Sequence, residues 1–482
     1  MGKLNRRTLI GRKPETAVLE KAYQSDEPEM VAVIGRRRVG KTFLVRQCYA
    51  ERVVFEMTGI KNGKKSEQLR HFKDRLNHFA QPAQPYKSPK NWQAAFEMLT
   101  AWLEKRESDE KAVVFFDELP WLAGKRSDFI KAFGLFWNSW ASQQHIVVVI
   151  CGSAASWMIT HVVRDKGGLH NRITRRILLK PFNLCETEQY FQHRGIRFER
   201  YHLLELYMAL GGIPHYLKEV EGGKTATENI DQICFSEQGL LRDEFGELYA
   251  ALFDNAQYHI QIVRALATTW QGMSRMEIAS ATGIADGGHL SRYLEELTNS
   301  GFIAAFLAFG KKKKELRFRL IDEYSLFYLQ FMENSRTEGS GTWMRRSQTQ
   351  AWKSWSGYAF ESICLKHIPQ IKKALGITGI YSEASNFYLK NSAFGRGLQI
   401  DLLIDRNDKA INLFELKFYA EPFVLKTAVA EEIRLKKAIF KEATGTNKQL
   451  FYTLLSTFLP ANEHAAAVFD RLLDMHCLFE EG

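Results

Sequence analysis

A loop that could hold the phosphates of a nucleotide is the clearest chemical pattern in the sequence. The segment GRRRVGKT at residues 35–42 carries Gly35 and then, after four residues, Gly40, Lys41 and Thr42. Glycines let backbone N–H groups turn inward around phosphate oxygens, while the lysine supplies a mobile cation and the threonine offers a hydroxyl to Mg²⁺. The residues that would complete the loop are Arg36, Arg37, Arg38, Val39 and Phe43. The pattern predicts binding of ATP or GTP with Mg²⁺, the alternative being a chance Gly-Lys-Thr turn.

An acidic pair could serve the same nucleotide. Asp117 and Glu118 follow the apolar run at residues 113–116, and open α/β sheets bind their ligands at the carboxyl ends of strands. Asp117 would hold Mg²⁺ directly or through water, and Glu118 would orient or deprotonate the attacking water. The pair therefore predicts hydrolysis of the nucleotide. The alternative is that both carboxylates only begin a polar loop.

Two further sets of residues could contact the γ-phosphate. Ser153 follows the apolar run at residues 146–150 and could sense this phosphate from a neighbouring strand end, or it could cap the next helix. Arg172, Arg175 and Arg176 precede or begin the next apolar run. Any one of them could act as an arginine finger, in its own chain or in a neighbour's site, while the others would be surface or packing residues.

A second group of acidic residues, near the end of the chain, has the pattern of a metal site. Asp401 and Glu415 each lie in an apolar, strand-like run, and Lys417 shares a face with Glu415 because side chains alternate along a strand. Glu361 stands in an apolar helical pattern, where a carboxylate needs a partner or a metal. Carboxylates that chelate Mg²⁺ or Mn²⁺ beside a lysine could hydrolyse a phosphodiester. The alternative is an ion pair on an edge strand and an aspartate in a turn.

The elements that must position these residues can be read from the apolar pattern. Short apolar runs separated by helical patterns are typical of a parallel sheet with both faces covered, and they lie at residues 31–34, 53–57, 113–116, 146–150 and 177–179. Residues 65–80 and 92–105 fit the covering helices. The fold class of the amino-terminal half is therefore α/β, with the first strand leading directly into the glycine loop.

The middle of the chain has the spacing of a winged helix-turn-helix. Helical patterns occur at residues 259–269, 274–280 and 288–299, and strand patterns occur at residues 302–309 and 316–321. Four lysines at residues 311–314 would lie at the tip of the hairpin that these two strands form. Lysines at the tip of a hairpin would suit phosphate contacts. Glu295 and Glu296 on the third helix are a poor match to a DNA groove, so a module that only packs domains together is the alternative.

The bulk composition limits the class of protein. The formal net charge of +11 favours a polyanionic partner, and the six cysteines form no CxxC pair, which argues against a zinc site or a disulfide framework. No apolar run approaches the roughly 20 residues that cross a bilayer, and the basic start is followed by no apolar stretch. We therefore expect a cytoplasmic protein that does not enter the membrane.

The amino-terminal half resembles the archaeal-type P-loop ATPases of the STAND class, which are related to AAA+ proteins. The resembling segments, in the expected order, are LIGRKPE, GRRRVGKT, VVFFDELPWL, ICGSAASWM, GGLHNRITRRILLKPF and LGGIPHYL. The resemblance implies that Gly11 and Arg12 lie beside the nucleotide base and that Pro214, in a helical lid, contacts the nucleotide from the other side. The three arginines inside the loop depart from the usual pattern and could alter nucleotide preference.

The last 130 residues or so resemble the restriction-endonuclease-like PD-(D/E)xK superfamily. The resemblance is carried by a helix acid, Glu361, then Asp401 in IDLL, then ELK at residues 415–417. It implies that Glu361, Asp401 and Glu415 are metal ligands and that Glu415 and Lys417 are catalytic. The proline expected before the aspartate is absent, and Gln399 and Ile400 stand there instead.

These patterns predict a multi-domain protein with a P-loop parallel sheet, a helical lid, a winged helix and a restriction-endonuclease-like α/β domain. The expected boundaries are 1–190 for the ATPase core, 191–255 for the lid, 256–332 for the winged helix, 333–349 for a linker and 350–482 for the last domain.

Three functions are compatible with this organisation. The first hypothesis is an ATPase that controls a metal-dependent deoxyribonuclease. The second is a nucleotide-switched regulator whose last domain is a scaffold, and the third is a DNA-binding transcription regulator. Homo-oligomers are compatible with all of them.

Overall fold

The computed structural model describes most of the chain and divides it into two compact units. The described residues are 8–124, 127–164, 167–335, 339, 341–392, 395–425, 428–462 and 467–481. The first unit comprises residues 1–181 and 251–254, and the second comprises 182–250 and 255–482. The division after Pro181 differs from the boundary expected at residue 190, because the helix that begins at Leu184 packs with the second unit.

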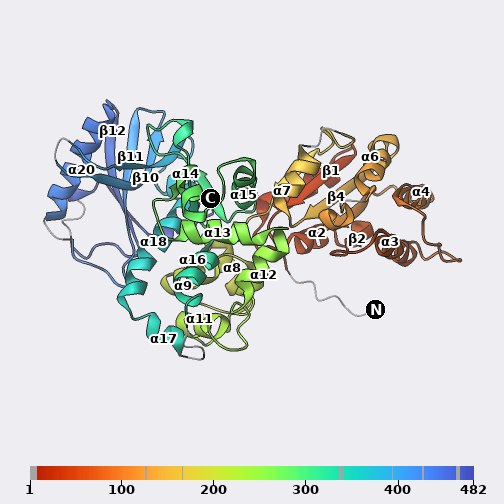
Figure 1. Ribbon diagram of the computed structural model, residues 1–482, viewed down its shortest axis with the longest axis horizontal. Helices are drawn as coiled ribbons and strands as arrows, with labels where there is room; N and C mark the ends of the chain where they lie inside the picture. Colours follow the sequence, from red (N-terminus) through yellow and green to blue (C-terminus); the bar gives the residue numbers. More distant parts are fainter. Residues whose placement is uncertain are drawn as a thin grey trace. The chain divides into compact units, whose positions relative to one another are not determined.

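The first unit contains a five-stranded parallel sheet, as the apolar runs predicted (Figure 1). Its strands are β1 (Glu29–Ile34), β2 (Val53–Thr58), β3 (Ala112–Asp117), β4 (Ile146–Gly152) and β5 (Arg175–Leu178). Every residue of β1 and of β4 is buried, which explains why their sequences read as continuous apolar runs rather than alternating ones.

Helices cover both faces of this sheet. They are α1 (Lys13–Gln24), α2 (Lys41–Tyr49), α3 (Lys65–Ala80), α4 (Trp92–Leu103), α5 (Leu119–Leu122), α6 (Phe129–Ser139) and α7 (Ala155–Met158). On one face, α3, α4 and α6 bury an aromatic cluster in which Phe96 and Phe129 lie 5.8 Å from the ring of Phe116 on β3. On the other face, α1 and α2 pack against the sheet.

The strand order determines which loops meet at the carboxyl edge of the sheet. The order is β2-β3-β4-β1-β5, so β4 lies between β1, which enters the glycine loop, and β3, which ends in Asp117. Because all neighbouring strands are parallel, their carboxyl ends lie on the same side. The residue that follows β4, Ser153, is therefore placed between the glycine loop and the acidic pair.

The second unit begins with helices and a small antiparallel sheet. The helices before this sheet are α8 (Leu184–His193), α9 (Arg200–Leu210), α10 (Pro214–Leu217), α11 (Ala226–Cys234), α12 (Glu244–Leu252) and α13 (Ala256–Ala267). The following elements are β6 (Met273–Ser274), α14 (Arg275–Thr282), α15 (Gly288–Asn299), β7 (Ile303–Phe306), β8 (Arg317–Leu320) and α16 (Glu323–Phe327). The three strands pair in the order β6-β8-β7. Residues 255–332, which contain α13, α14, α15 and these strands, are called the helix–hairpin segment below.

A mixed five-stranded sheet forms the last part of the second unit. Its elements are α17 (Thr342–Arg346), α18 (Gln350–Lys366), α19 (Ile368–Ala374), β9 (Ser382–Leu389), β10 (Leu398–Arg406), β11 (Ala410–Lys417), α20 (Ala428–Thr444), β12 (Gln449–Ser456) and β13 (Arg471–Asp474). The order is β13-β12-β11-β10-β9, with β9, β10 and β11 antiparallel and β11, β12 and β13 parallel. Helix α20 buries Ile433, Ile439 and Phe440 against one face of it (Figure 1).

The linker expected at residues 333–349 is not an unpacked connection where the structure describes it. Trp343 on α17 is 1% exposed and lies within an aromatic cluster with Phe327 and Phe331. The carboxylate of Asp231 on α11 accepts hydrogen bonds of 2.6 Å from the backbone N–H of Gly341 and of Trp343. Residues 336–338 and 340 lie outside the described residues. The prediction of a linker was wrong for α17, because the burial of Trp343 in the aromatic cluster packs this helix against the second unit.

None of the described helices is long and apolar enough to cross a membrane.

Candidate functional site

The glycine loop connects the end of β1 to the start of α2 in a shape that depends on glycine. A Cβ atom added to Gly35 would meet the carbonyl oxygen of Leu179 at 2.4 Å, so the loop begins in close contact with the end of β5. Gly40, which precedes α2, has a φ of 95°, a conformation that residues with a side chain rarely adopt. The backbone therefore turns directly into the amino terminus of α2, where N–H groups without helical partners can receive phosphate oxygens.

Lys41 is buried at the first position of α2 and is held by oxygen atoms. Its Nζ donates to the carbonyl oxygen of Arg36 at 3.1 Å and to Oγ of Ser153 at 2.9 Å. These are weak, neutral acceptors for an ammonium group. A bound triphosphate would offer stronger, charged acceptors to the same Nζ.

The side chains of Thr42 and Asp117 meet across the sheet edge, as the nucleotide prediction requires. Oγ1 of Thr42 donates to Oδ2 of Asp117 at 2.8 Å, and Asp117 is 4% exposed. A hydroxyl oxygen beside a carboxylate is a hard-oxygen donor set that fits Mg²⁺. These two residues would hold the ion, which would neutralise charge on the phosphate oxygens.

Glu118 is fixed in an unusual conformation at the end of β3. Its φ of 49° and ψ of 51° place it in the left-handed region, although it is not a glycine. Its carboxylate accepts hydrogen bonds from the Ser153 hydroxyl and, at 3.1 Å, from the Ser153 backbone N–H. Strain of this kind persists only where the surroundings impose it, and it is concentrated at functional sites.

Ser153 connects the two halves of the site. Its hydroxyl accepts a hydrogen bond from Lys41 and donates one to Glu118. The following helix α7 has Ala154 at its cap position and no side-chain cap, so the serine does not serve as the expected cap. One hydroxyl thus links the cation of the loop to the candidate base.

Arg12 joins the opening segment of the chain to the glycine loop. Its guanidinium is 4% exposed and donates from Nη2 to the carbonyl oxygen of Val39 at 3.3 Å. Both Gly11 and Arg12 have positive φ values, of 62° and 58°. The segment expected to lie beside the nucleotide therefore contacts the loop directly.

The three arginines proposed as fingers lie apart from this edge of the sheet or are exposed. Nη2 of Arg175 pairs at 2.6 Å with Glu29, the first residue of β1, at the opposite end of that strand from the glycine loop. That ion pair corrects the expectation for Arg175 as a finger within its own chain. Arg172 and Arg176 are exposed, and a role in a neighbour's site stays a prediction.

Pro214 begins α10 in the second unit, and its expected contact with the nucleotide stays a prediction.

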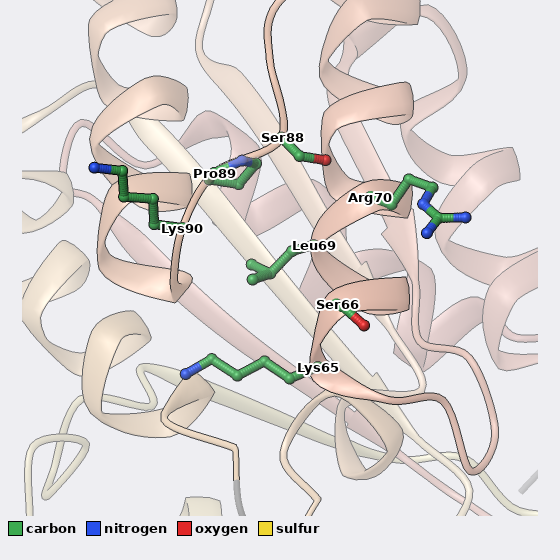
Figure 2. A pocket seen from close by; sticks show the side chains of 7 residues that line it. All are labelled: Lys65, Ser66, Leu69, Arg70, Ser88, Pro89 and Lys90. Atoms are coloured by element: carbon green, nitrogen blue, oxygen red, sulfur yellow. The ribbon is translucent and has the colours of Figure 1, made fainter.

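A surface pocket of about 500 Å³ elsewhere in the first unit does not qualify as a site. Figure 2 shows the charged ends of Lys90 and Arg70 directed to opposite sides of it, and Lys65 pairs at 2.9 Å with Asp128. Its lining includes no residue of the glycine loop. Ligand sites need polar groups that converge, and these diverge.

A second candidate site lies on the sheet of the last domain, where β10 and β11 run antiparallel. Leu403 pairs with Leu413, and Asp401 and Glu415 each lie two residues beyond this pair on their own strands. The pairing of β10 with β9 shifts by one residue between Ile400 and Leu403, a bulge that includes Asp401. Bulges are frequent beside active sites because they re-aim a side chain.

Glu415 is surrounded by cations and a phenol. Its two carboxylate oxygens pair with Lys417 and with Lys436 of α20, each at 2.9 Å, and the hydroxyl of Tyr452 donates to it at 3.1 Å. Burial alone would raise the pKa of Glu415, but the charges of the two lysines outweigh it and lower the pKa. Glu415 is therefore an anion at neutral pH, and the pKa of Lys417 is raised by this partner against the opposing effect of burial.

The pKa of Glu361 on α18 is shifted in the opposite direction from that of Glu415. Burial, followed by the charge of Asp401, raises the pKa of Glu361 to about 8, and Lys417 opposes the shift. The four residues expected from the sequence are thus electrostatically coupled. Among the described residues, however, no three Asp, Glu, His or Cys side chains lie close enough together to hold a metal ion.

Lys436 and Tyr452 were missed by the sequence analysis. They come from a surface helix and from the neighbouring strand, and no spacing in the sequence links either one to Glu415. Only the pairing of β11 with β12 brings Tyr452 near.

Comparisons with known proteins agree with the geometry of the first site. Residues 9–220 match the family described as an ATPase domain predominantly from Archaea. Over 414 residues the chain is 23% identical to the uncharacterized protein MJECL04 of Methanocaldococcus jannaschii, covering 85% of this chain and 87% of that protein.

One solved structure shows the fold, and others are similar over part of this chain. The Walker-type ATPase PABY2304 of Pyrococcus abyssi has a TM-score of 0.50 at 17% identity, over 68% of this chain and 98% of that chain. The ORC2 protein of Aeropyrum pernix, in its ADPNP–ADP complexes, has a TM-score of 0.40 at 16% identity, over 71% of this chain and 96% of that chain. Residues 9–220 thus match a model of an archaeal-type ATPase domain, and they carry the Thr42–Asp117 and Ser153–Glu118 contacts of the first site.

Proposed function

We propose that the protein hydrolyses ATP in its first unit and uses this reaction to control a metal-dependent deoxyribonuclease in its last domain. The observation that carries the hydrolytic half is the hydrogen-bond chain from Lys41 through Ser153 to Glu118. It holds a carboxylate and an ammonium group on either side of one hydroxyl, as a reaction between water and the γ-phosphate needs.

The roles in ATP hydrolysis follow from these positions. Water attacks the γ-phosphorus, a new P–O bond forms, and the bond to the β-phosphate oxygen breaks so that ADP leaves. Glu118 orients the water and accepts its proton, while Lys41 neutralises charge on the β- and γ-phosphate oxygens. Thr42 and Asp117 would hold Mg²⁺, and Ser153 keeps Glu118 in its strained conformation.

The positions of Asp401 and Glu415 on adjacent strands, beside a bulge of β10, support the nuclease half. Carboxylates on adjacent strands are the oxygen ligands that Mg²⁺ and Mn²⁺ prefer, and Glu361 would add a third. Burial raises the pKa of Glu361 and the charge of Asp401 adds to that shift, and an ion bound there would favour the charged carboxylate. Lys417, which stays protonated, would stabilise charge on the phosphate or orient the attacking water.

A winged helix is our proposal for the helix–hairpin segment. Its support is the order of α13, α14 and α15 followed by the antiparallel pair β7 and β8. The exposed lysines between the two strands, at residues 311–314, are placed where they could meet DNA phosphates.

DNA cleavage with and without ATP tests the whole proposal. Purified protein with Mn²⁺ or Mg²⁺ should cut a DNA substrate in an ATP-dependent manner. Lys41→Ala should remove the ATP dependence, and Asp401→Ala and Lys417→Ala should abolish cleavage while ATP hydrolysis continues. Lys441→Ala, an exposed lysine of α20, is the matched control. Cleavage that survives both site variants would refute the nuclease assignment.

One observation favours a different function for the last domain. Glu415 is already paired with two lysines, and the described acidic residues do not form a ready metal site. A scaffold in a nucleotide-switched regulator would have such a network for stability alone. This second candidate predicts ATP-dependent self-association with no DNA cleavage, measurable by light scattering with ATP and with ADP.

A further inference from the structure

One partly buried arginine of the helix–hairpin segment interacts electrostatically with acids of the last domain. Arg319 lies on β8, opposite Ala304 of β7, and its guanidinium carbon lies 5.2 Å from the centre of the Phe306 ring. The charges that act on this guanidinium are the carboxylates of Glu361 and Asp401, the two acids of the candidate nuclease site. A strand of one segment thus contributes a cation to the acidic cluster of another.

The helix–hairpin segment contacts both elements that carry these acids. The ring of Trp270 stacks on Tyr358, three residues before Glu361 on α18, with centroids 4.8 Å apart and planes 9° apart. Close by, Nε2 of Gln271 donates to Oε1 of Gln399 at 3.2 Å, two residues before Asp401 on β10.

A third contact fixes the end of the hairpin. The backbone N–H of Phe309 donates to the carbonyl oxygen of Asn386 on β9 at 2.8 Å, and the Phe309 ring packs 5.6 Å from Phe440 of α20. The position of Arg319 relative to the acids is therefore set by contacts with α18, β9, β10 and α20.

The hydrogen-bonding capacity of Arg319 is incompletely used. Its Nε is buried and has no hydrogen-bond partner within the part of the chain that the structure describes. Burial lowers the pKa of Arg319 to about 10, so the group still carries its charge at neutral pH. A buried donor without an acceptor is rare in native proteins, because it has lost water without a replacement.

We infer that Arg319 completes the candidate nuclease site by binding a phosphate oxygen of DNA beside Glu361 and Asp401. The inference rests on the proposed nuclease function and extends it, because it makes the site a composite of two segments. A guanidinium presents several N–H donors in a planar fork that matches the oxygens of a phosphodiester. Its position over Phe306 would hold the fork in one orientation before DNA arrives.

Arg317 shows why this role falls to Arg319. It lies two residues earlier on the same face of β8, but its Nη2 is committed to the carbonyl oxygen of Gly272 at 2.7 Å and to Glu277 at 3.0 Å. Both partners belong to the helix–hairpin segment itself. Arg317→Ala is therefore a control with the same chemical change on the same strand, and thermal melting checks that the turn at Gln271 and Gly272, which Arg317 holds, stays folded.

DNA binding in Ca²⁺, which occupies oxygen sites but supports little cleavage, separates binding from chemistry. Fluorescence anisotropy of a labelled duplex over a range of salt concentrations would be measured for the full chain and for Arg319→Ala, Arg319→Lys and Arg317→Ala. We expect Arg319→Ala to weaken binding by about 10- to 100-fold, as for loss of a charged hydrogen bond, and to reduce the slope of log K against log [salt] by about 0.9. Arg319→Lys should restore the slope but not the full affinity, and Arg317→Ala should match the parent.

Cleavage in Mn²⁺ and metal uptake complete the test. If Arg319→Ala binds DNA with the parent's affinity and salt slope, the inference is wrong even where the parent cuts DNA. If Arg319→Ala takes up Mn²⁺ more tightly and leaves DNA binding unchanged, the guanidinium only replaces a metal ion and the inference is again wrong. If DNA binding depends on Arg319 but the parent never cuts, the inference stands and the nuclease proposal fails. Thermal melting of Arg319→Lys checks that the fold is intact.

Discussion

Replacing Ser153 by alanine would separate the two tasks of the ATPase site, because one hydroxyl contacts both the loop lysine and the candidate base. The change removes the 2.9 Å hydrogen bond from Lys41 and the bond to Glu118 and leaves a buried methyl group. We expect Lys41 to turn to the phosphates when ATP binds, so the loss of its bond to Ser153 should have little effect on turnover. The carboxylate of Glu118 would then keep the backbone N–H of residue 153, at 3.1 Å, as its hydrogen-bond partner among the described residues.

The size of the effect follows from one lost charge-assisted hydrogen bond. Such bonds contribute about 1.5–3 kcal/mol, and each 1.36 kcal/mol of barrier is about tenfold in rate, so kcat should fall roughly 10- to 150-fold. KM for ATP should stay constant or fall, because Ser153 no longer competes with the phosphates for Nζ of Lys41. Ser156→Ala, three residues later on α7, is the control and should leave both constants unchanged.

Steady-state ATPase kinetics with saturating Mg²⁺ would measure both constants, and titration with a fluorescent ATP analogue would measure affinity alone. A raised KM with an unchanged kcat would refute the reasoning, because it would show that Ser153 acts in binding rather than in positioning Glu118. Unchanged values of both constants would show that the backbone N–H suffices to hold the carboxylate.

Three further predictions concern stability. Gly35→Ala should lower the melting temperature of the first unit and weaken ATP binding, because the added Cβ would lie 2.4 Å from the Leu179 carbonyl oxygen, an overpacking that costs about 1–3 kcal/mol; Gly379→Ala, with no described atom within 4 Å, should change little in a thermal melt. Trp343→Ala should cost the second unit about 3–5 kcal/mol in denaturant unfolding, whereas Met344→Ala, 49% exposed, should be near neutral. Between pH 6.5 and 8, Glu361 stays protonated in the folded chain (pKa about 8) but is ionised in the unfolded chain. Because the unfolded state then binds fewer protons, the free energy of unfolding should fall as pH rises. Glu361→Gln should flatten this dependence of the free energy of unfolding on pH. Below pH 6.5, buried His367, with a pKa of about 4, acts in the opposite sense, which sets the lower limit of that window.

Most of the first unit could be predicted because its signals are local. Each strand of the parallel sheet is a continuous apolar run, and the glycine loop stands directly between such a run and a helix. The contacts of Thr42 with Asp117 follow from placing two carboxyl ends on one edge. The double role of Ser153 could not be predicted, since it depends on β4 lying between β1 and β3, and strand order is not written in any single segment.

The second unit was less predictable because its important contacts join distant segments. The acids at 401 and 415 were found because each lies in an apolar, strand-like run, but the bulge at Asp401 arises from pairing with β9, which the sequence analysis did not identify. The role of Arg319 could not be predicted, because an arginine in a strand has the sequence pattern of an exposed basic residue. Its neighbours become clear only from the stacking of Trp270 on Tyr358. The small polar residues before Trp343 led to the prediction of a linker. The burial of Trp343 in the structure shows instead that α17 is packed.

The contacts at the start of the second unit suggest how a change in the ATPase domain would reach the candidate nuclease site. The chain enters this unit at residue 182, and two residues later the backbone N–H of Leu184 donates to Nε2 of His367 at 3.1 Å. Because Nδ1 of His367 contacts the carbonyl oxygen of Ile363 at 2.8 Å and its pKa is lowered by burial, the ring is neutral and can accept that bond. Glu361 lies six residues before His367 on α18, which is about 9 Å along the helix axis at about 1.5 Å per residue. A displacement of the entering segment would therefore act on the helix that carries Glu361, and we expect ATP to change the position of this acid.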